Sequence, residues 1–93
     1  MLKQVEKVNY RIVRPLGLIS ENGNITTELN LISYNNYKPK LDLRKWEKKG
    51  DLKIMQRGLT LTLEEAKELK KNLDNYLEHA EELIKEKEET TGA

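Results

Sequence analysis

Cations and aromatic rings alternate with apolar residues in the middle of this sequence. Taken at every second position, one face of the expected strands carries Tyr34, Lys40, Asp42, Arg44, Trp46, Lys53, Met55 and Arg57. Lys and Arg bind phosphates and flat rings stack on unpaired bases, so this composition suits single-stranded nucleic acid. The alternative is the solvated outer face of an antiparallel sheet, which ordinarily carries lysines. Trp46 and Met55 favour the binding surface, because large apolar groups on a polar face form a patch that usually has a purpose.

Charge is unevenly distributed along the 93 residues, although the net charge is only +1. Residues 38–57 carry 8 basic and 3 acidic groups, whereas residues 58–93 carry 5 basic and 10 acidic groups. A basic segment attracts polyanions, and an acidic segment repels them. The distribution therefore indicates an anion-binding middle followed by an end that keeps nucleic acid away.

Three smaller features have ordinary explanations beside functional ones. The Lys-Lys-Gly cluster at residues 48–50 could meet a phosphate, but such clusters are more often soluble turns. Asp42 has no partner acid nearby, so we expect it to orient Arg44 or a neighbouring lysine rather than to act in catalysis. His79, the single histidine, falls in a predicted helix beside a carboxylate, where histidines are usually solvated.

Composition excludes several classes of protein. The absence of cysteine removes disulfide frameworks, thiol catalysis and most zinc sites, and is typical of a reducing cytoplasm. No run approaches the ~18 apolar residues of a membrane span, and the N-terminus lacks the apolar segment of a signal peptide. No base is in sequence reach of a serine or threonine. We therefore expect no enzymatic activity, no metal and no cofactor.

Alternation of apolar and polar residues predicts four strands, which cover residues 8–19, 25–34, 40–46 and 52–57. Pro15 and Gly17 indicate an edge, a bend or a bulge in the first strand. Turn residues lie at 20–24 and 35–37, and a polar loop is expected at 47–51.

One long helix is predicted to follow the strands, because Thr62 and Glu65 form a capping box at its start. Its apolar residues recur at steps of three and four. A helix of about 25 residues is ~38 Å long, whereas four strands span ~15 Å. The far end must therefore lie on a partner subunit, project into water or fray, and residues 86–91 suggest fraying. The stripe favours contact between the helices of two subunits through Leu69, Leu73, Tyr76, Leu77 and Ala80.

Several segments resemble one known family in their order along the chain. They are Leu16–Asn22, Glu28–Tyr34, Lys38–Trp46, Leu52-Lys53 and Gln56–Thr62. Over about residues 8–77 the chain is similar to the positive-cofactor-four family of transcriptional coactivators, specifically its bacterial YdbC-like branch. The resemblance implies an α+β fold, in which a curved four-stranded antiparallel sheet is followed by one long C-terminal helix. It also implies a homodimer with paired helices and with channels for single-stranded DNA.

The same resemblance implies roles for individual residues. Arg44 would contact the DNA strand, and Trp46 would stack on its bases. Tyr34 matches an aromatic residue at the end of the second strand, and Lys38 matches a basic residue in the turn that follows. Together with the strand-face argument, the predicted binding residues are Tyr34, Lys38, Lys40, Arg44, Trp46, Lys53, Met55 and Arg57.

We expect one binding domain over residues 8–78, preceded by an arm over residues 1–7 and followed by a helix extension and acidic tail over residues 79–93. The expected function is sequence-tolerant binding of single-stranded DNA by a transcription or DNA-metabolism cofactor in the cytoplasm, at the nucleoid, with the transcription machinery as a candidate partner. Two alternatives stay open. Stacking and phosphate contacts also suit an RNA-binding or RNA-chaperone module, and the acidic helix suits a protein-interaction adaptor.

Overall fold

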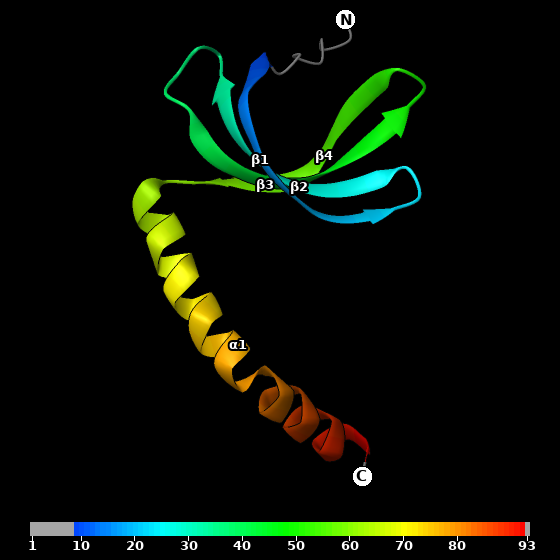
Figure 1. Cartoon of the computed structure of the whole chain (residues 1–93), viewed down its shortest axis with the longest axis vertical. Helices are drawn as coiled ribbons and strands as arrows, with labels where there is room; N and C mark the ends of the chain where they lie inside the picture. Colours follow the sequence, from blue (N-terminus) through cyan, green and yellow to red (C-terminus); the bar gives the residue numbers. More distant parts are fainter. Residues whose placement is uncertain (1–8, 93) are drawn as a thin grey trace, which may run out of the picture. The chain divides into compact units, whose positions relative to one another are not determined.

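A computed structural model describes residues 9–92, with side chains as far as residue 85, and within them it shows four strands and one helix (Figure 1). The elements are β1 (Tyr10–Asn22), β2 (Ile25–Tyr34), β3 (Lys40–Lys49), β4 (Leu52–Leu61) and α1 (Leu63–Gly92). The strands form one open antiparallel sheet in the order β1-β2-β3-β4. The predicted sheet-then-helix fold is confirmed. The arm predicted over residues 1–7 lies outside the described residues.

Tight turns join β1 to β2 and β3 to β4. Gly23, in the first turn, has a φ of 63°, and Gly50, in the second, has a φ of 60°. Glycine adopts such positive φ angles without steric cost. Lys49 pairs with Leu52, so the loop predicted over residues 47–51 is in fact a two-residue turn. The hairpin continues through charged residues, which is why β3 and β4 are longer than the alternation predicted.

β-Bulges bend both edge strands of the sheet. The register of β1 on β2 shifts three times, at Val13, Leu16 and Ile19, and the register of β4 on β3 shifts once, opposite Lys45. Each bulge adds a residue to the edge strand, bends it and increases the local twist. The irregularity predicted from Pro15 in β1 is therefore confirmed, and it recurs along most of the strand.

The sheet curves so strongly that residues near its opposite ends meet. Tyr10 pairs with Tyr34 at one end of β2, whereas Trp46 pairs with Thr26 near the other end. A straight strand would separate these two positions by about 27 Å, yet the ring centroids of Tyr10 and Trp46 are 5.7 Å apart. The face of the sheet that carries Trp46 is therefore its concave face, which we call the inner face.

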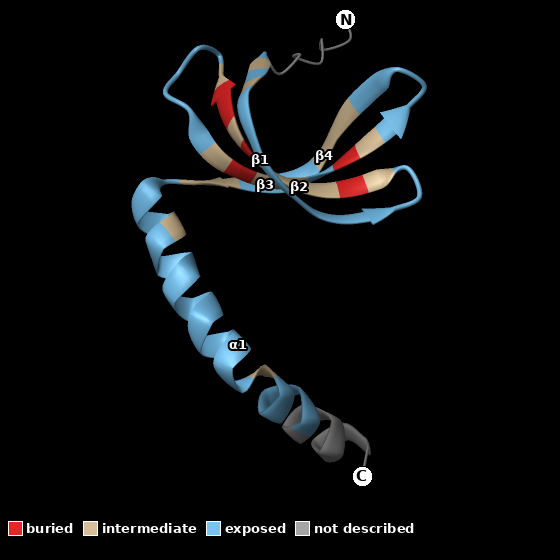
Figure 2. Ribbon diagram, viewed as in Figure 1, coloured by how far each residue is buried: buried red, intermediate tan, exposed pale blue. Residues whose placement is uncertain are grey.

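The buried residues of the described chain belong to β2 and β3 (Figure 2), and the strand pairing places most of them on this inner face. Ile32 and Trp46 are buried apolar residues, and Thr26, Asn30 and Asp42 are buried polar residues. The opposite face, which we call the leucine face, carries four half-buried leucines at positions 29, 31, 41 and 43. The curvature of the sheet therefore buries the centre of its inner face. This is the face that sequence alternation predicted to bind a ligand.

The helix α1 forms a compact unit of its own, separate from the unit that contains the sheet. It begins directly after Thr62, as the capping box predicts, and continues to Gly92, so the frayed tail expected over residues 86–91 is helical. Its large apolar side chains are exposed: Leu69, Leu73, Tyr76 and Leu77 range from 38% to 65%, and Ala80 is half-buried.

Within the described residues, no helix has both the length and the apolar character that crossing a bilayer requires. The single domain expected over residues 8–78 stays a prediction.

Candidate nucleic-acid interface

Asp42 holds Arg44 in place at the centre of the inner face. Arg44 Nε donates to Asp42 Oδ1 at 2.7 Å, and Arg44 Nη2 donates to Asp42 Oδ2 at 2.8 Å. The Tyr34 hydroxyl donates to the same Oδ2 at 2.7 Å. Arg44 Nη1 donates to the carbonyl oxygen of Gln56 at 2.8 Å. Such bidentate, charge-assisted bonds fix geometry strongly. The expectation that Asp42 orients Arg44 is confirmed.

The Arg44 network is largely enclosed, and the predicted contact of Arg44 with the DNA strand stays a prediction. The side chain of Arg44 is 12% exposed and that of Asp42 is 0% exposed. The hydrogen bond to Asp42, working against burial, raises the pKa of Arg44 above its usual value. Burial, followed by the bond to Asp42, raises the pKa of Tyr34 to about 12. Arg44 is therefore a fixed positive charge beneath the inner face, with most of its five N–H donors already bonded within the protein.

Gly58 of β4 makes room for Arg44. The two residues pair directly across β3 and β4, and a Cβ added to Gly58 would lie 2.6 Å from the Arg44 Cα and would also overlap the Arg44 Cβ. Glycine within a strand often marks such a close approach of two backbones. The position of the arginine thus depends on the missing side chain opposite it.

Trp46 is fully buried, so the prediction that its ring forms part of an exposed apolar patch is wrong. The ring of Tyr10 packs against it with an interplanar angle of 52°, and the half-buried Met55 pairs with it from β4. The ammonium of Lys53 lies over the ring, 5.1 Å from its centroid. The alternation of polar and apolar residues along a strand identifies the face on which a residue lies. It does not show that the sheet curves around that residue and buries it.

The indole nitrogen of Trp46 is a buried hydrogen-bond donor. Among the buried side-chain nitrogens and oxygens of the described residues, Trp46 Nε1 alone lacks a hydrogen bond. Leaving a buried donor unpaired costs about 1–3 kcal/mol, and such groups call for an explanation in strain or function.

Lys53 is held above Trp46 by an ion pair that crosses the inner face from β4 to β2. Its Nζ lies 2.8 Å from Glu28 Oε1. Glu28 also accepts hydrogen bonds from Thr26 Oγ1 at 2.6 Å and from Asn30 Nδ2 at 3.5 Å. Burial disfavours the ionised form of Glu28, but the hydrogen bonds and the charge of Lys53 outweigh it and lower the pKa of Glu28. The carboxylate is therefore ionised at neutral pH and positions the lysine.

A groove of about 470 Å³ lies beside the Glu28–Lys53 pair. Its floor is formed by β2, one wall by β1, and the other wall by the β3–β4 hairpin. The residues that line it are Pro15, Leu16, Gly17, Leu18, Glu21, Thr26, Glu28, Asn30, Lys48 and Lys53. Sequence reasoning identified only Lys53 among them as a binding residue. Glu28 and Asn30 alternate with the leucines of β2, and that signal was sufficient to place them on the inner face.

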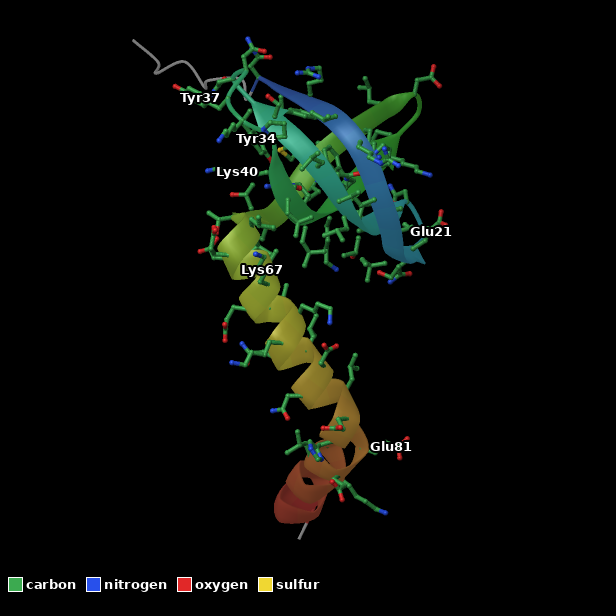
Figure 3. All side chains as sticks on the ribbon, turned by 60° about the vertical axis from the view of Figure 1, so that its left-hand side comes forward. Glu21, Tyr34, Tyr37, Lys40, Lys67 and Glu81 are labelled. Carbon is green, nitrogen blue, oxygen red and sulfur yellow. The ribbon has the colours of Figure 1, made fainter. Side chains whose placement is uncertain are left out.

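Further exposed cations lie at the two ends of the inner face. Figure 3 shows Tyr34, Tyr37 and Lys40 at one end of the sheet and Glu21 at the other. Lys40 is exposed at the first end, as is Lys38 in the turn before it, and Lys48 is exposed at the second end. Positive charge at both ends of a concave surface attracts a polyanion along its length. Among the described residues, no three His, Asp or Glu side chains gather in a way that could hold a metal ion.

Arg57 lies on the leucine face, so the prediction that it shares a face with Trp46 is wrong. Trp46 pairs with Met55 and Arg44 pairs with Gly58, which means that β4 uses three residue steps where β3 uses two. This bulge reverses the alternation, and Arg57 lines a shallow pocket with Ile25 and Lys45. A one-residue shift moves every later side chain to the other face. The predicted contact of Arg57 with DNA stays a prediction.

Comparison with known proteins gives the chain a family. The family model described as Transcriptional Coactivator p15 (PC4) matches residues 24–72, which is more than half of the chain and includes β2, β3 and β4. No curated protein matches. Members of this family are non-enzymatic, coactivator-like proteins that bind single-stranded DNA. The matched segment contains Glu28, Arg44, Trp46 and Lys53 of the inner face described above. The chain therefore belongs to the family of the transcriptional coactivator p15 (PC4).

Proposed function

We propose that this protein binds single-stranded DNA along the inner face of its sheet, with little dependence on sequence. One observation carries the proposal: an exposed lysine, Lys53, covers the ring of Trp46 on a concave face that has cations at both ends. A phosphate can attract that lysine, and a base can then take its place over the ring. Membership of a family that binds single-stranded DNA supports the proposal.

Binding would begin with phosphates and end with stacking. Lys38, Lys40 and Lys53 attract the backbone, and the ammonium of Lys53 exchanges Glu28 for a phosphate oxygen. The uncovered ring of Trp46 then stacks on a base, an interaction worth about 1–3 kcal/mol. Tyr34 offers a second ring. A duplex hides the faces of its bases, so this mechanism favours unpaired DNA.

The proposal is tested by fluorescence anisotropy with single-stranded and duplex oligonucleotides over a range of salt concentrations. Single-stranded DNA should bind more tightly, with a slope of about −0.7 per neutralised phosphate in the plot of log affinity against log salt. Lys40→Ala should reduce the magnitude of that slope by about 0.7. Lys45→Ala is the matched control, because this exposed lysine is in the same strand on the opposite face. Equal binding of duplex DNA, or equal effects of both variants, would contradict the proposal.

RNA of the same sequence, added as a competitor, decides whether ribose is also accepted.

We also propose that the protein acts as a homodimer joined through α1. The exposed leucines on the helix support this, because large apolar side chains that recur on one face usually become covered. Leu73→Glu should yield monomers in sedimentation velocity. Lys71→Glu, about 200° around the helix from Leu73, should leave the dimer intact. A wild-type protein that sediments as a monomer would exclude this assembly.

The finer placement of the protein is a further part of the proposal. The ordered matches over Lys38–Trp46 and Gln56–Thr62 support the bacterial YdbC-like branch, and membership of a family of transcriptional coactivators supports a contact with the transcription machinery. A bacterial DNA-binding protein would be located in the cytoplasm, at the nucleoid. A fluorescently tagged protein should overlap with nucleoid DNA and co-purify with RNA polymerase after nuclease treatment. A diffuse distribution without the polymerase would contradict this placement.

A further inference from the structure

The side-chain nitrogen of Lys53, Nζ, takes part in two interactions at once on the inner face. It lies 2.8 Å from Glu28 Oε1 and 5.1 Å from the centroid of the Trp46 ring. A donor over an aromatic ring and against a carboxylate is also what a stacked base with an amino group would provide. The groove beside the pair, about 470 Å³ in volume, gives such a base room to enter.

Glu28 needs a replacement donor when Lys53 leaves. Its side chain is only 13% exposed, so water solvates the carboxylate poorly. The bonds from Thr26 and Asn30 remain, and Oε1 loses its charged partner. A buried carboxylate that loses a hydrogen bond is costly. The most favourable ligand at this position is therefore one that brings its own N–H group to Oε1.

We propose that the groove is a base subsite in which Glu28 accepts a hydrogen bond from an exocyclic amino group, so that this position prefers amino-bearing bases to thymine and uracil. The carboxylate of an acidic side chain accepts from the N4 amino group of cytosine in known protein–DNA contacts. Thymine and uracil present a carbonyl oxygen where cytosine has that amino group, and two acceptors facing each other repel. The inference rests on the proposed function, since it assigns a role to one position along the bound strand.

The walls of the groove suit this role. Leu16 and Leu18 of β1 are 47% and 60% exposed, and they offer apolar surface to the edge of a base. Lys48 lines the wall across the groove and is exposed, where it can hold the adjacent phosphate. Apolar surface on the β1 wall, a polar floor and a cation on the opposite wall agree with a ligand pocket, in which apolar surface is combined with a few placed polar or charged groups.

The test compares oligodeoxycytidine with oligodeoxyuridine of equal length, because these bases have the same size. They differ only at C4, where cytosine has an amino group and uracil a carbonyl oxygen, and at the adjacent N3, which is unprotonated in cytosine and an N–H group in uracil. The wild-type protein should bind the cytidine oligomer about fivefold to tenfold more tightly, the ratio that one hydrogen bond provides. Glu28→Gln should bring the two affinities within about twofold, because an amide can donate as well as accept. The matched control is Glu47→Gln, which removes the same charge from the leucine face, where Glu47 accepts a bond from Gln56 at 3.3 Å.

The outcomes separate the two proposals. Equal affinity of the wild-type protein for both oligomers overturns the base subsite and leaves single-strand binding intact. A cytidine preference that survives in Glu28→Gln, or that disappears equally in Glu47→Gln, also overturns it. No binding of either oligomer overturns the proposed function together with the subsite. The wild-type comparison needs no variant, so the inference remains testable if Glu28→Gln fails to fold.

Discussion

The ammonium of Lys53 lies over the ring of Trp46, 5.1 Å from its centroid, so the free protein covers its only tryptophan with a cation. A cation over an aromatic face contributes about 0.5–2 kcal/mol, depending on how far water is excluded. Under the proposed function, binding of DNA would exchange one contact of the ring for another. The lysine that shields Trp46 would also be a group that a phosphate attracts, which would couple capture of the backbone to exposure of the stacking surface.

Removing this lysine should expose the ring. We predict that Lys53→Ala increases the quenching of Trp46 fluorescence by acrylamide and reduces the magnitude of the DNA salt slope by about 0.7. Lys48→Ala is the control, because Lys48 pairs with Lys53 across the hairpin. It should change the salt slope without changing the quenching. Unchanged quenching in Lys53→Ala would show that other residues enclose the ring by themselves.

Trp46 should contribute strongly to stability as well as to binding. Because its side chain is fully buried, replacing it with alanine leaves a cavity, and we expect Trp46→Ala to lower the free energy of unfolding by about 3–5 kcal/mol. Leu59→Ala, at a position that is 50% exposed, should cost much less. Urea denaturation followed by circular dichroism measures both variants. Similar losses for the two variants would contradict the burial of Trp46. Trp46→Phe is the better variant for binding studies because it preserves more of the packing.

Tyr34 should make stability depend on alkaline pH. Its pKa is raised from 10.0 to about 12 in the folded protein, first by burial and then by the bond to Asp42. The folded state therefore holds the phenolic proton more tightly than the unfolded chain does. The resulting contribution is complete below pH 10 and is lost as the pH rises toward 12.

The measurement for Tyr34 is the difference in unfolding free energy between the wild-type protein and Tyr34→Phe as a function of pH. Taking the difference between the two proteins removes the pH dependence that they share. We expect this difference to be constant below pH 10 and to decline between pH 10 and 12. A difference that stays flat through this window would exclude the network around Asp42.

Replacing Gly58 should destabilise the protein, although Gly58 lies in a β-strand rather than in a turn. An added methyl group would collide with the Cα of Arg44 at 2.6 Å, and backbone cannot move aside as a side chain can. We expect Gly58→Ala to destabilise the protein by about 2 kcal/mol or more, the cost of inserting a group into filled space. Gly17→Ala is the matched control, since nothing lies within 4 Å of a Cβ there. Thermal unfolding of the two variants checks the prediction, and equal melting temperatures would contradict the close approach.

Strand alternation correctly predicted that Asp42, Arg44 and Trp46 share one face of β3, because they follow one another at every second position without a bulge between them. The same reasoning was wrong for Arg57. The extra residue in β4 follows from how that strand pairs with β3, and no turn residue in the sequence marks it. The capping box at Thr62 predicted the start of the helix correctly, since it depends on residues that are neighbours in the chain.

The burial of Trp46 could not be predicted from residue types, since it arises from the curvature of the whole sheet. Pro15 and Gly17 indicated one irregularity in β1, whereas the strand contains three register shifts. These shifts bend the edge strand enough for Tyr10 to reach Trp46. The face of Glu28, in contrast, could be predicted from the sequence, because Glu28 alternates with Leu29 and Leu31 in β2.

A titration of Trp46 fluorescence with single-stranded DNA, run beside fluorescence anisotropy of the labelled DNA, tests the central claim that DNA binds on the inner face. Trp46 is the only tryptophan, so its emission reports that face alone. The claim predicts saturable quenching that follows the anisotropy curve, weakens as salt rises and is much smaller with duplex DNA. Single-stranded DNA that binds by anisotropy while the emission of Trp46 and its accessibility to acrylamide stay unchanged would contradict it and place the interface elsewhere on the protein.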